Sequence, residues 1–206
     1  QKIDEINKTK LKKKDKSMLE FAAANVYHKS KEFTKASYRL KQANQLKLSY
    51  QESDINSHLA LTFKTTIQAR QVAEGESTDG TGRIFIIGAP RCGSTLLESV
   101  LATNSNILDL GESKALSEAF YQIQDRADDK EFILSLSDAY TKALGFQPSS
   151  CAHSVDKNLY NFRFIEAIAR AMPAAKIIHC RRHPLDNILS MLRSNLQAGN
   201  GYTANP

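Results

Sequence analysis

The feature that most constrains the fold is the run Ile84–Ile87, which is short, continuously apolar and ends at Gly88. Such a run is typical of a strand buried on both faces of a sheet. After a polar turn, apolar residues recur at helical spacing: Leu96, Leu97, Val100 and Leu101. A second run, Lys176–Cys180, is likewise predicted to be a buried strand, and a helix follows it from Pro184. Two strand–turn–helix units predict an α/β fold with a parallel sheet flanked by helices.

The turn after the first strand has the composition of an anion-binding loop. It runs from Gly88 to Thr95 and leads into a helix N-terminus, where free N–H groups and the helix dipole receive an oxyanion. It nearly matches the nucleotide-triphosphatase P-loop, G-x-x-x-x-G-K-[ST], but Ser94 holds the lysine position and the cation is Arg91, inside the loop. This displacement disfavours ATP, because the missing lysine is the group that reaches its β- and γ-phosphates. A tight turn that binds nothing is the alternative.

The loop resembles the 5′-phosphosulfate-binding loop of sulfotransferases, typically P-[KR]-[SC]-G-[ST]-[ST]. The resemblance implies the sulfotransferase fold, the donor 3′-phosphoadenosine-5′-phosphosulfate (PAPS), its product 3′,5′-adenosine bisphosphate, and no metal. It also implies the donor-binding residues: Pro90, Arg91, Cys92, Gly93, Ser94, Thr95 and Leu96. Arg91 would in addition stabilise charge during transfer. Cys92 stands where serine is commoner and is a poorer hydrogen-bond donor, so we expect it to act through its backbone.

A second motif follows the second strand. The residues from Arg182 to Ser190 resemble the family's 3′-phosphate motif, R-x-P-x-D-x-x-x-S. Arg182 can grip a phosphate with two parallel hydrogen bonds, and Ser190 can add a hydroxyl from the helix. Asp186 is expected to cap or organise this segment, since a carboxylate would repel phosphate. A 3′-phosphate site favours PAPS, because ATP and GTP carry no such group. A basic strand end without a ligand is the alternative.

Two further elements supply candidate catalytic residues. Gly111-Glu112 resembles the G-E element of tyrosylprotein sulfotransferases and of bacterial tetratricopeptide-repeat sulfotransferases, whose glutamate is the general base. Asp156-Lys157 resembles the family's D-K-x-P element, whose lysine reaches the transferring group; Leu159 stands where proline is usual. Without the resemblance, the alternative interpretations are that Glu112 is a charge at a helix N-terminus and that Lys157 is a solvated lysine.

Three histidines are weaker candidates for a base: His153, His179 and His183. None has a visible partner in the sequence. His179 lies within a predicted strand, so we expect it to pack in the core.

The N-terminal part of the chain is predicted to be helical. Residues 18–47 predict two helices, and Asp54–Glu74 a third. Residues at the packing positions of a tetratricopeptide repeat occur in the first pair: Ala24, Tyr27, Ala36, Leu40 and Ala43. A single repeat cannot bury its own faces, so we expect the end of a repeat array that could recruit a protein partner. An unrelated helical hairpin is the alternative.

The domain boundary is predicted at Gly75–Gly82, which is glycine-rich and polar. We expect residues 1–76 to form the tetratricopeptide-like segment and residues 82–206 to form the PAPS-binding core. Members of the family that it resembles continue beyond the helix of the 3′-phosphate motif. The core is therefore expected to be incomplete at its C-terminus.

Composition limits the partners and the location that we expect for the chain. The net charge of +6 owes much to Lys8–Lys16, which reads as a solvated segment, so we expect no nucleic-acid partner. No apolar run is long enough to span a membrane, and no signal peptide is recognisable. The three cysteines (Cys92, Cys151 and Cys180) contain no C-x-x-C pair, so neither a disulfide framework nor a zinc site is predicted. A cytoplasmic location fits these observations.

The leading interpretation is a PAPS-dependent sulfotransferase that transfers a sulfuryl group to a hydroxyl acceptor by in-line displacement. The acceptor stays open among a protein tyrosine, a glycan and a small molecule. A P-loop kinase or nucleotide triphosphatase is the first alternative. The second is a non-catalytic interaction module in which the repeats recruit a partner.

Overall fold

The structure is a computed structural model that describes residues 11–70, 79–123, 129–145, 152–196 and 200–204, with the side chains of 66–70 and 129–134 excluded. The chain divides into two units. One comprises Leu59–Arg182, and the other comprises Gln1–His58 together with His183–Pro206. This division follows the contacts within the chain. It does not test the predicted domains, residues 1–76 and 82–206, which remain a prediction. Cys151 and most of the predicted linker lie outside the described residues.

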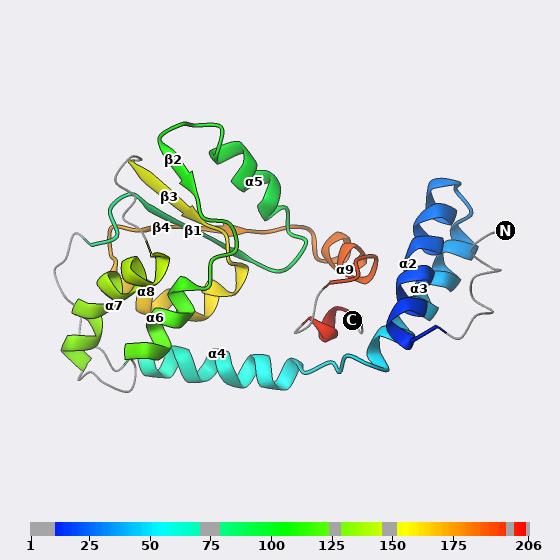
Figure 1. The fold of residues 1–206 in the computed structure, drawn as a ribbon, viewed down its shortest axis with the longest axis horizontal. Helices are drawn as coiled ribbons and strands as arrows, with labels where there is room; N and C mark the ends of the chain where they lie inside the picture. The colour runs from blue at the N-terminus through cyan, green and yellow to red at the C-terminus, as the bar shows by residue number, and fades with distance from the viewer. Residues whose placement is uncertain (1–10, 71–78, 124–128, 146–151, 197–199, 205–206) are drawn as a thin grey trace. The chain divides into compact units, whose positions relative to one another are not determined.

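The unit Leu59–Arg182 is built around a parallel sheet of four strands in the order β2-β3-β1-β4 (Figure 1). The strands are β1 (Arg83–Gly88), β2 (Ile107–Asp109), β3 (His153–Asp156) and β4 (Lys176–Cys180). The predicted α/β fold with a parallel sheet is confirmed. Both strands predicted from apolar runs are present. The strands β2 and β3 were not predicted.

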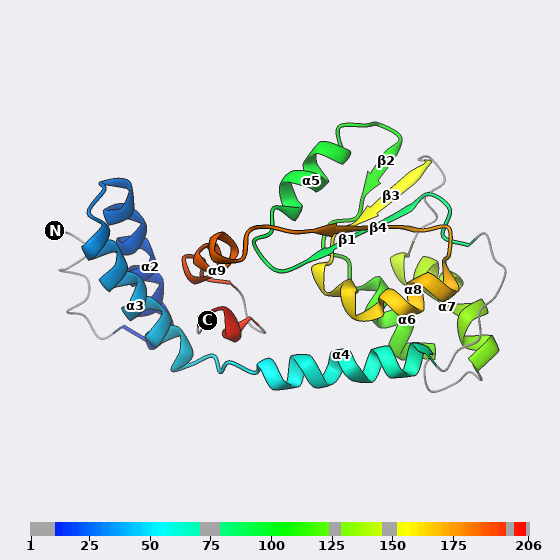
Figure 2. The same cartoon turned by 180° about the vertical axis from the view of Figure 1, so that it is seen from behind.

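The core of this unit lies on one side of the sheet. Helices α6 (Ala115–Ile123), α7 (Asp129–Leu144) and α8 (Ile165–Ala171) gather there, whereas α5 (Ser94–Leu101) lies on the opposite side (Figures 1 and 2). The buried cluster joins Phe85 of β1 to Leu116, Phe120, Leu136 and Tyr140 of the helices. The 3-10 helix η1 (Leu159–Phe164) adds Phe164 to this cluster.

The second predicted strand is not buried on both faces. Among the described residues β4 pairs only with β1 and forms an edge of the sheet, with Ile177 and His179 exposed. The expectation that His179 packs in the core is therefore wrong. The prediction assumed a central strand, whereas β4 has a neighbouring strand on one side only and its side chains are less covered.

The other unit is helical. Helices α2 (Lys13–Lys29) and α3 (Phe33–Leu48) pack together and bury small residues between them, namely Ala23, Ala24, Ala36 and Ala43. The hydroxyl of Ser17 on α2 donates to the carbonyl oxygen of Ala43 at 2.9 Å. Helix α9 (Pro184–Leu192) and the 3-10 helix η2 (Gly201–Ala204) belong to the same unit, and the Asn44 side chain donates to the Leu192 carbonyl oxygen at 2.9 Å. Helix α4 (Ile55–Arg70) follows α3 along the chain.

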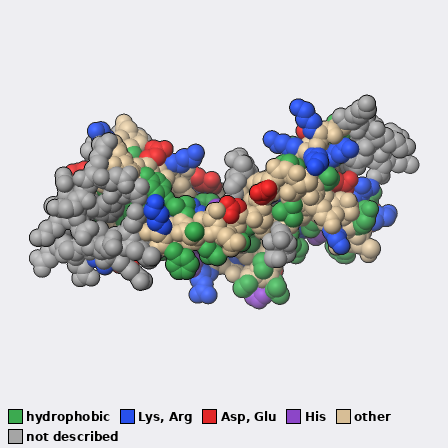
Figure 3. Space-filling view, turned by 90° about the horizontal axis from the view of Figure 1, so that it is seen from below, with side chains coloured by type: hydrophobic (Ala, Val, Ile, Leu, Met, Phe, Trp, Pro, Cys, Tyr) green, Lys and Arg blue, Asp and Glu red, His purple; other side chains and the backbone are tan. Residues whose placement is uncertain are grey.

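Much of the basic charge is displayed on the helical pair. Lysines 12, 13, 14, 29, 31, 35 and 41 are exposed there, and basic side chains project on the side of Figure 3 where α2 and α3 lie. Charges spread over both helices fit the interpretation of a solvated surface. No helix within the described ranges is long and apolar enough to cross a membrane.

Candidate functional site

The loop Ala89–Gly93 connects β1 to α5 at the carboxyl end of the sheet. A Cβ at Gly88 would lie 2.6 Å from the Cys180 carbonyl oxygen, so only glycine fits beside the end of β4. Gly93 precedes α5 with φ of 103°, and Arg91 has φ of 69°. These left-handed conformations turn the backbone sharply before the helix begins. The N–H groups of Ser94 and Thr95 begin the helix and have no carbonyl oxygen within it to bond, whereas those of Leu96 and Leu97 donate to the Gly93 carbonyl oxygen.

The polar groups of the loop suit an anion. The Arg91 and Thr95 residues are exposed, whereas Ser94 and Cys92 are buried. Leu96 is 72% exposed, so it contributes no packing to the core. Between Gly88 and Leu97 the polar side chains are the Arg91 guanidinium, the Cys92 thiol and the Ser94 and Thr95 hydroxyls, with no carboxylate. This set of donors suits an oxyanion, and Pro90 shapes the turn without adding an N–H group.

Arg182 lies beside the loop. Its Nη1 donates to the backbone carbonyl oxygen of Arg91 at 3.3 Å, although the residues are 91 positions apart. The pairing of β1 with β4 accounts for this, because Gly88 and Cys180 are partners in the register. Ser190 lies on α9, in the other unit, so the structure does not test its pairing with Arg182.

Glu112 and Lys157 form an ion pair with 2.8 Å between Nζ and Oε1. Glu112 lies in the segment after β2, and Lys157 directly follows β3. The parallel pairing of these strands continues past their ends, where the Lys157 N–H donates to the Gly111 carbonyl oxygen at 2.9 Å. The Glu112 side chain is 72% exposed and that of Lys157 only 8%. The pair thus offers an accessible carboxylate beside a sheltered ammonium.

Glu98 is a site residue that the sequence analysis missed. It lies on α5, and its Oε2 is 3.4 Å from the Lys157 Nζ. Burial raises the pKa of Glu98, the Asp109 carboxyl raises it further, and Lys157 opposes both effects. Burial lowers the pKa of Lys157, but Glu112 and Glu98 outweigh it and the pKa lies above its ordinary value. The available signal was a single carboxylate in the helix that follows the loop, four residues after Ser94.

Asp156 anchors the segment that carries Lys157. Its carboxylate accepts hydrogen bonds from the Tyr140 hydroxyl at 2.9 Å and from the Asn158 N–H at 3.0 Å. Asn158 in turn donates through its side chain to the Ser113 carbonyl oxygen at 2.7 Å. Burial raises the pKa of Asp156 to about 6, against the opposing effect of these hydrogen bonds. These bonds hold the end of β3 against the Glu112 segment.

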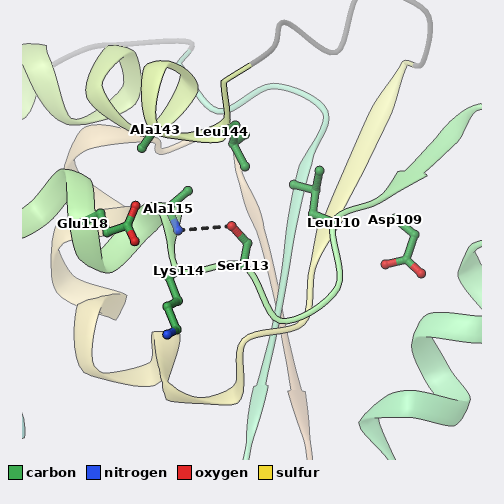
Figure 4. A pocket seen from close by; sticks show the side chains of 8 residues that line it. All are labelled: Asp109, Leu110, Ser113, Lys114, Ala115, Glu118, Ala143 and Leu144. Carbon is green, nitrogen blue, oxygen red and sulfur yellow. Dashed lines mark hydrogen bonds between the residues drawn. The ribbon is translucent and has the colours of Figure 1, made fainter.

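A separate pocket is lined in part by residues that flank Glu112 in the sequence. It has a volume of about 340 Å³, and its lining comprises Asp109, Leu110, Ser113, Lys114, Ala115, Glu118, Ala143 and Leu144 (Figure 4). Neither Glu112 nor Lys157 is part of the lining. The pocket therefore does not coincide with the ion pair.

Comparison with known proteins matches residues 83–205, more than half of the chain, to the family described as the Sulfotransferase family. An uncharacterized protein of Aquifex aeolicus (strain VF5) is 26% identical over 216 residues, covering 95% of this chain and 28% of that protein. The chain thus spans little more than a quarter of that relative's length. No solved structure matches the chain.

Proposed function

Because the chain belongs to the Sulfotransferase family, we propose that it binds PAPS and transfers its sulfuryl group to a hydroxyl acceptor. One observation carries the proposal. Lys157 contacts Glu112 from the G-E element and Glu98 from α5, the helix that begins at the loop. These contacts support the assignment of the proposed catalytic pair and the proposed donor loop to one site. Ligands of open parallel sheets bind at this edge.

The donor-binding roles follow from the groups present. The N–H groups of the first turn of α5, with the Ser94 and Thr95 hydroxyls, would hold the 5′-phosphosulfate. Arg91 would add positive charge in the same loop. Arg182, held beside the loop by its bond to the Arg91 carbonyl oxygen, would grip the 3′-phosphate, with Ser190 as its partner.

The catalytic roles follow from exposure and charge. PAPS supplies an activated sulfuryl group whose S–O bond to the 5′-phosphate breaks as the acceptor oxygen bonds to sulfur. Glu112 would accept the proton of the acceptor hydroxyl, because its carboxylate is exposed at the site. Lys157 and Arg91 would neutralise the negative charge that develops on the sulfuryl and leaving oxygens.

The helical pair α2–α3 supports a second part of the proposal. Its buried alanines occupy positions at which a tetratricopeptide repeat places small residues, and Tyr27 and Leu40 are half-buried between them. We propose that this pair is the end of a repeat array that recruits a protein partner.

Isothermal titration of the chain with 3′,5′-adenosine bisphosphate and with ADP tests the donor assignment. We expect tighter binding of the bisphosphate, without a requirement for Mg²⁺. A P-loop kinase or nucleotide triphosphatase would instead prefer ADP and require Mg²⁺. Equal binding of the two nucleotides would contradict the proposed function.

A further inference from the structure

The surroundings of Lys157 contain one more carboxylate than its proposed role requires. Lys157 is 6% exposed and lies between Glu112, at 2.8 Å, and Glu98, at 3.4 Å. The two carboxylates differ in access to solvent, since the Glu98 side chain is 9% exposed and that of Glu112 is 72% exposed. Only Glu112 can therefore meet an acceptor, while Glu98 can act only through Lys157.

The proposed reaction makes this difference important. When Glu112 accepts a proton, it becomes neutral and no longer balances the charge of Lys157. A buried ammonium without a counter-charge is unfavourable and tends to lose its proton. A carboxylate that stays ionised during the step prevents that loss. Glu98 is placed to do so, because its carboxylate contacts the same Nζ from helix α5.

We propose that Glu98 is a positioning residue for sulfuryl transfer, holding the Lys157 ammonium in place and charged while Glu112 takes up the acceptor's proton. This inference rests on the proposed function. It assigns to Glu98 no contact with the donor or the acceptor.

The groups around Glu98 determine how readily its carboxyl group ionises. Lys157, following β3, faces it, and the Asp109 carboxyl of β2 is a further titratable neighbour. Burial raises the pKa of Glu98, so the carboxylate is costly to keep ionised without the ammonium. Its Oε1 is buried and has no hydrogen-bond partner among the described residues, which leaves the contact with Lys157 as its main compensation.

The first test measures the charge of Lys157 directly. The chain is labelled with ¹³C at the lysine ε-carbons and titrated by NMR, and the Lys157 signal is assigned with Lys157→Arg. We expect Glu98→Gln, which keeps the shape and removes the charge, to lower the pKa of Lys157. Glu166→Gln, which breaks a surface ion pair with Arg170, is the matched control and should leave the Lys157 titration unchanged.

The second test measures transfer. In Glu98→Gln we expect kcat to fall roughly ten- to hundredfold, with the dissociation constant for 3′,5′-adenosine bisphosphate unchanged within about threefold. The alkaline limb of the pH–rate profile should move to lower pH, a change that a purely structural defect would not produce. Glu98→Asp, which retains the charge, should restore part of the rate. This variant also tests the proposal if Glu98→Gln folds poorly.

Coincident Lys157 titrations in the wild type and in Glu98→Gln would overturn the inference, since Glu98 would then carry no charge that Lys157 senses. The titration does not involve the donor. Its failure therefore counts against Glu98 alone, whereas equal binding of the bisphosphate and ADP by the wild-type chain counts against the proposed function.

Discussion

The ammonium of Lys157 lies 2.8 Å from the carboxylate of Glu112, a residue 45 positions earlier in the chain. The pairing of β2 with β3 produces this contact, because both residues leave adjacent parallel strands at the same edge. Each belongs to a different sequence element that resembles a sulfotransferase motif. Their meeting is a physical reason to treat the two elements as parts of one site.

Glu112→Gln is expected to remove the proton acceptor while keeping the shape of the side chain. Transfer from radiolabelled PAPS should fall by roughly 10²- to 10⁴-fold, the usual contribution of a general base. Binding of 3′,5′-adenosine bisphosphate should persist, because the loop and Arg182 are untouched. Glu166→Gln serves as the control. A Glu112→Gln variant with wild-type transfer would disprove the assignment of the base.

Arg182→Ala is expected to weaken binding of 3′,5′-adenosine bisphosphate at least tenfold, the size of a lost hydrogen bond to a charged group. Binding of 5′-AMP, which lacks the 3′-phosphate, should change little. Arg181→Ala removes the same charge from the exposed neighbouring position and should affect neither ligand. Titration calorimetry on both ligands checks the prediction. A similar loss for AMP and the bisphosphate would show that Arg182 does not read the 3′-phosphate.

The strand β1 was predictable because it is a continuous apolar run, Ile84–Ile87, that ends at Gly88. The strand β4 was predictable from the pair Ile177-Ile178, which lies between Pro173 and Pro184. By contrast, β2 has three residues, and β3 carries buried polar groups in Ser154 and Asp156. Those polar groups are satisfied by tertiary contacts such as the Tyr140 hydroxyl. A pattern of hydrophobicity therefore does not reveal them.

The candidate site was predictable as separate motifs and not as an arrangement. Arg91, Glu112, Lys157 and Arg182 were found through their resemblance to family elements, and the sheet register then accounts for which of them meet. Glu98 belongs to no such element. Its contact with Lys157 arises from the packing of α5 near the sheet edge, and neither its spacing nor its neighbours in sequence indicate that partner.

Asp156→Asn is expected to change how stability depends on pH. Burial raises the pKa of Asp156 from 3.8 to about 6, so its contribution to folding is full below pH 3.8 and is lost as pH rises through about 6. The asparagine variant lacks this loss. Its stability relative to wild type should therefore rise between about pH 4 and pH 7, by up to about 3 kcal/mol.

Urea unfolding at a series of pH values measures this difference. Asp138→Asn, which removes a carboxylate at an exposed position on α7, is the matched control. A difference between Asp156→Asn and wild type that does not change with pH would mean that Asp156 ionises in the fold as readily as in the unfolded chain.

Gly88→Ala is expected to destabilise the loop because the added Cβ would lie 2.6 Å from the Cys180 carbonyl oxygen and 3.0 Å from the Cys92 sulfur. A clash with backbone should cost roughly 1–3 kcal/mol in the free energy of unfolding and weaken bisphosphate binding, since the loop must shift. At Gly93 a Cβ would meet nothing within 4 Å, so Gly93→Ala should cost only the strain of its positive φ, about 1 kcal/mol. Urea unfolding and calorimetry compare the two. A larger loss of unfolding free energy in Gly93→Ala than in Gly88→Ala would contradict the prediction. Crowding by the end of β4 would then not explain the glycine at position 88.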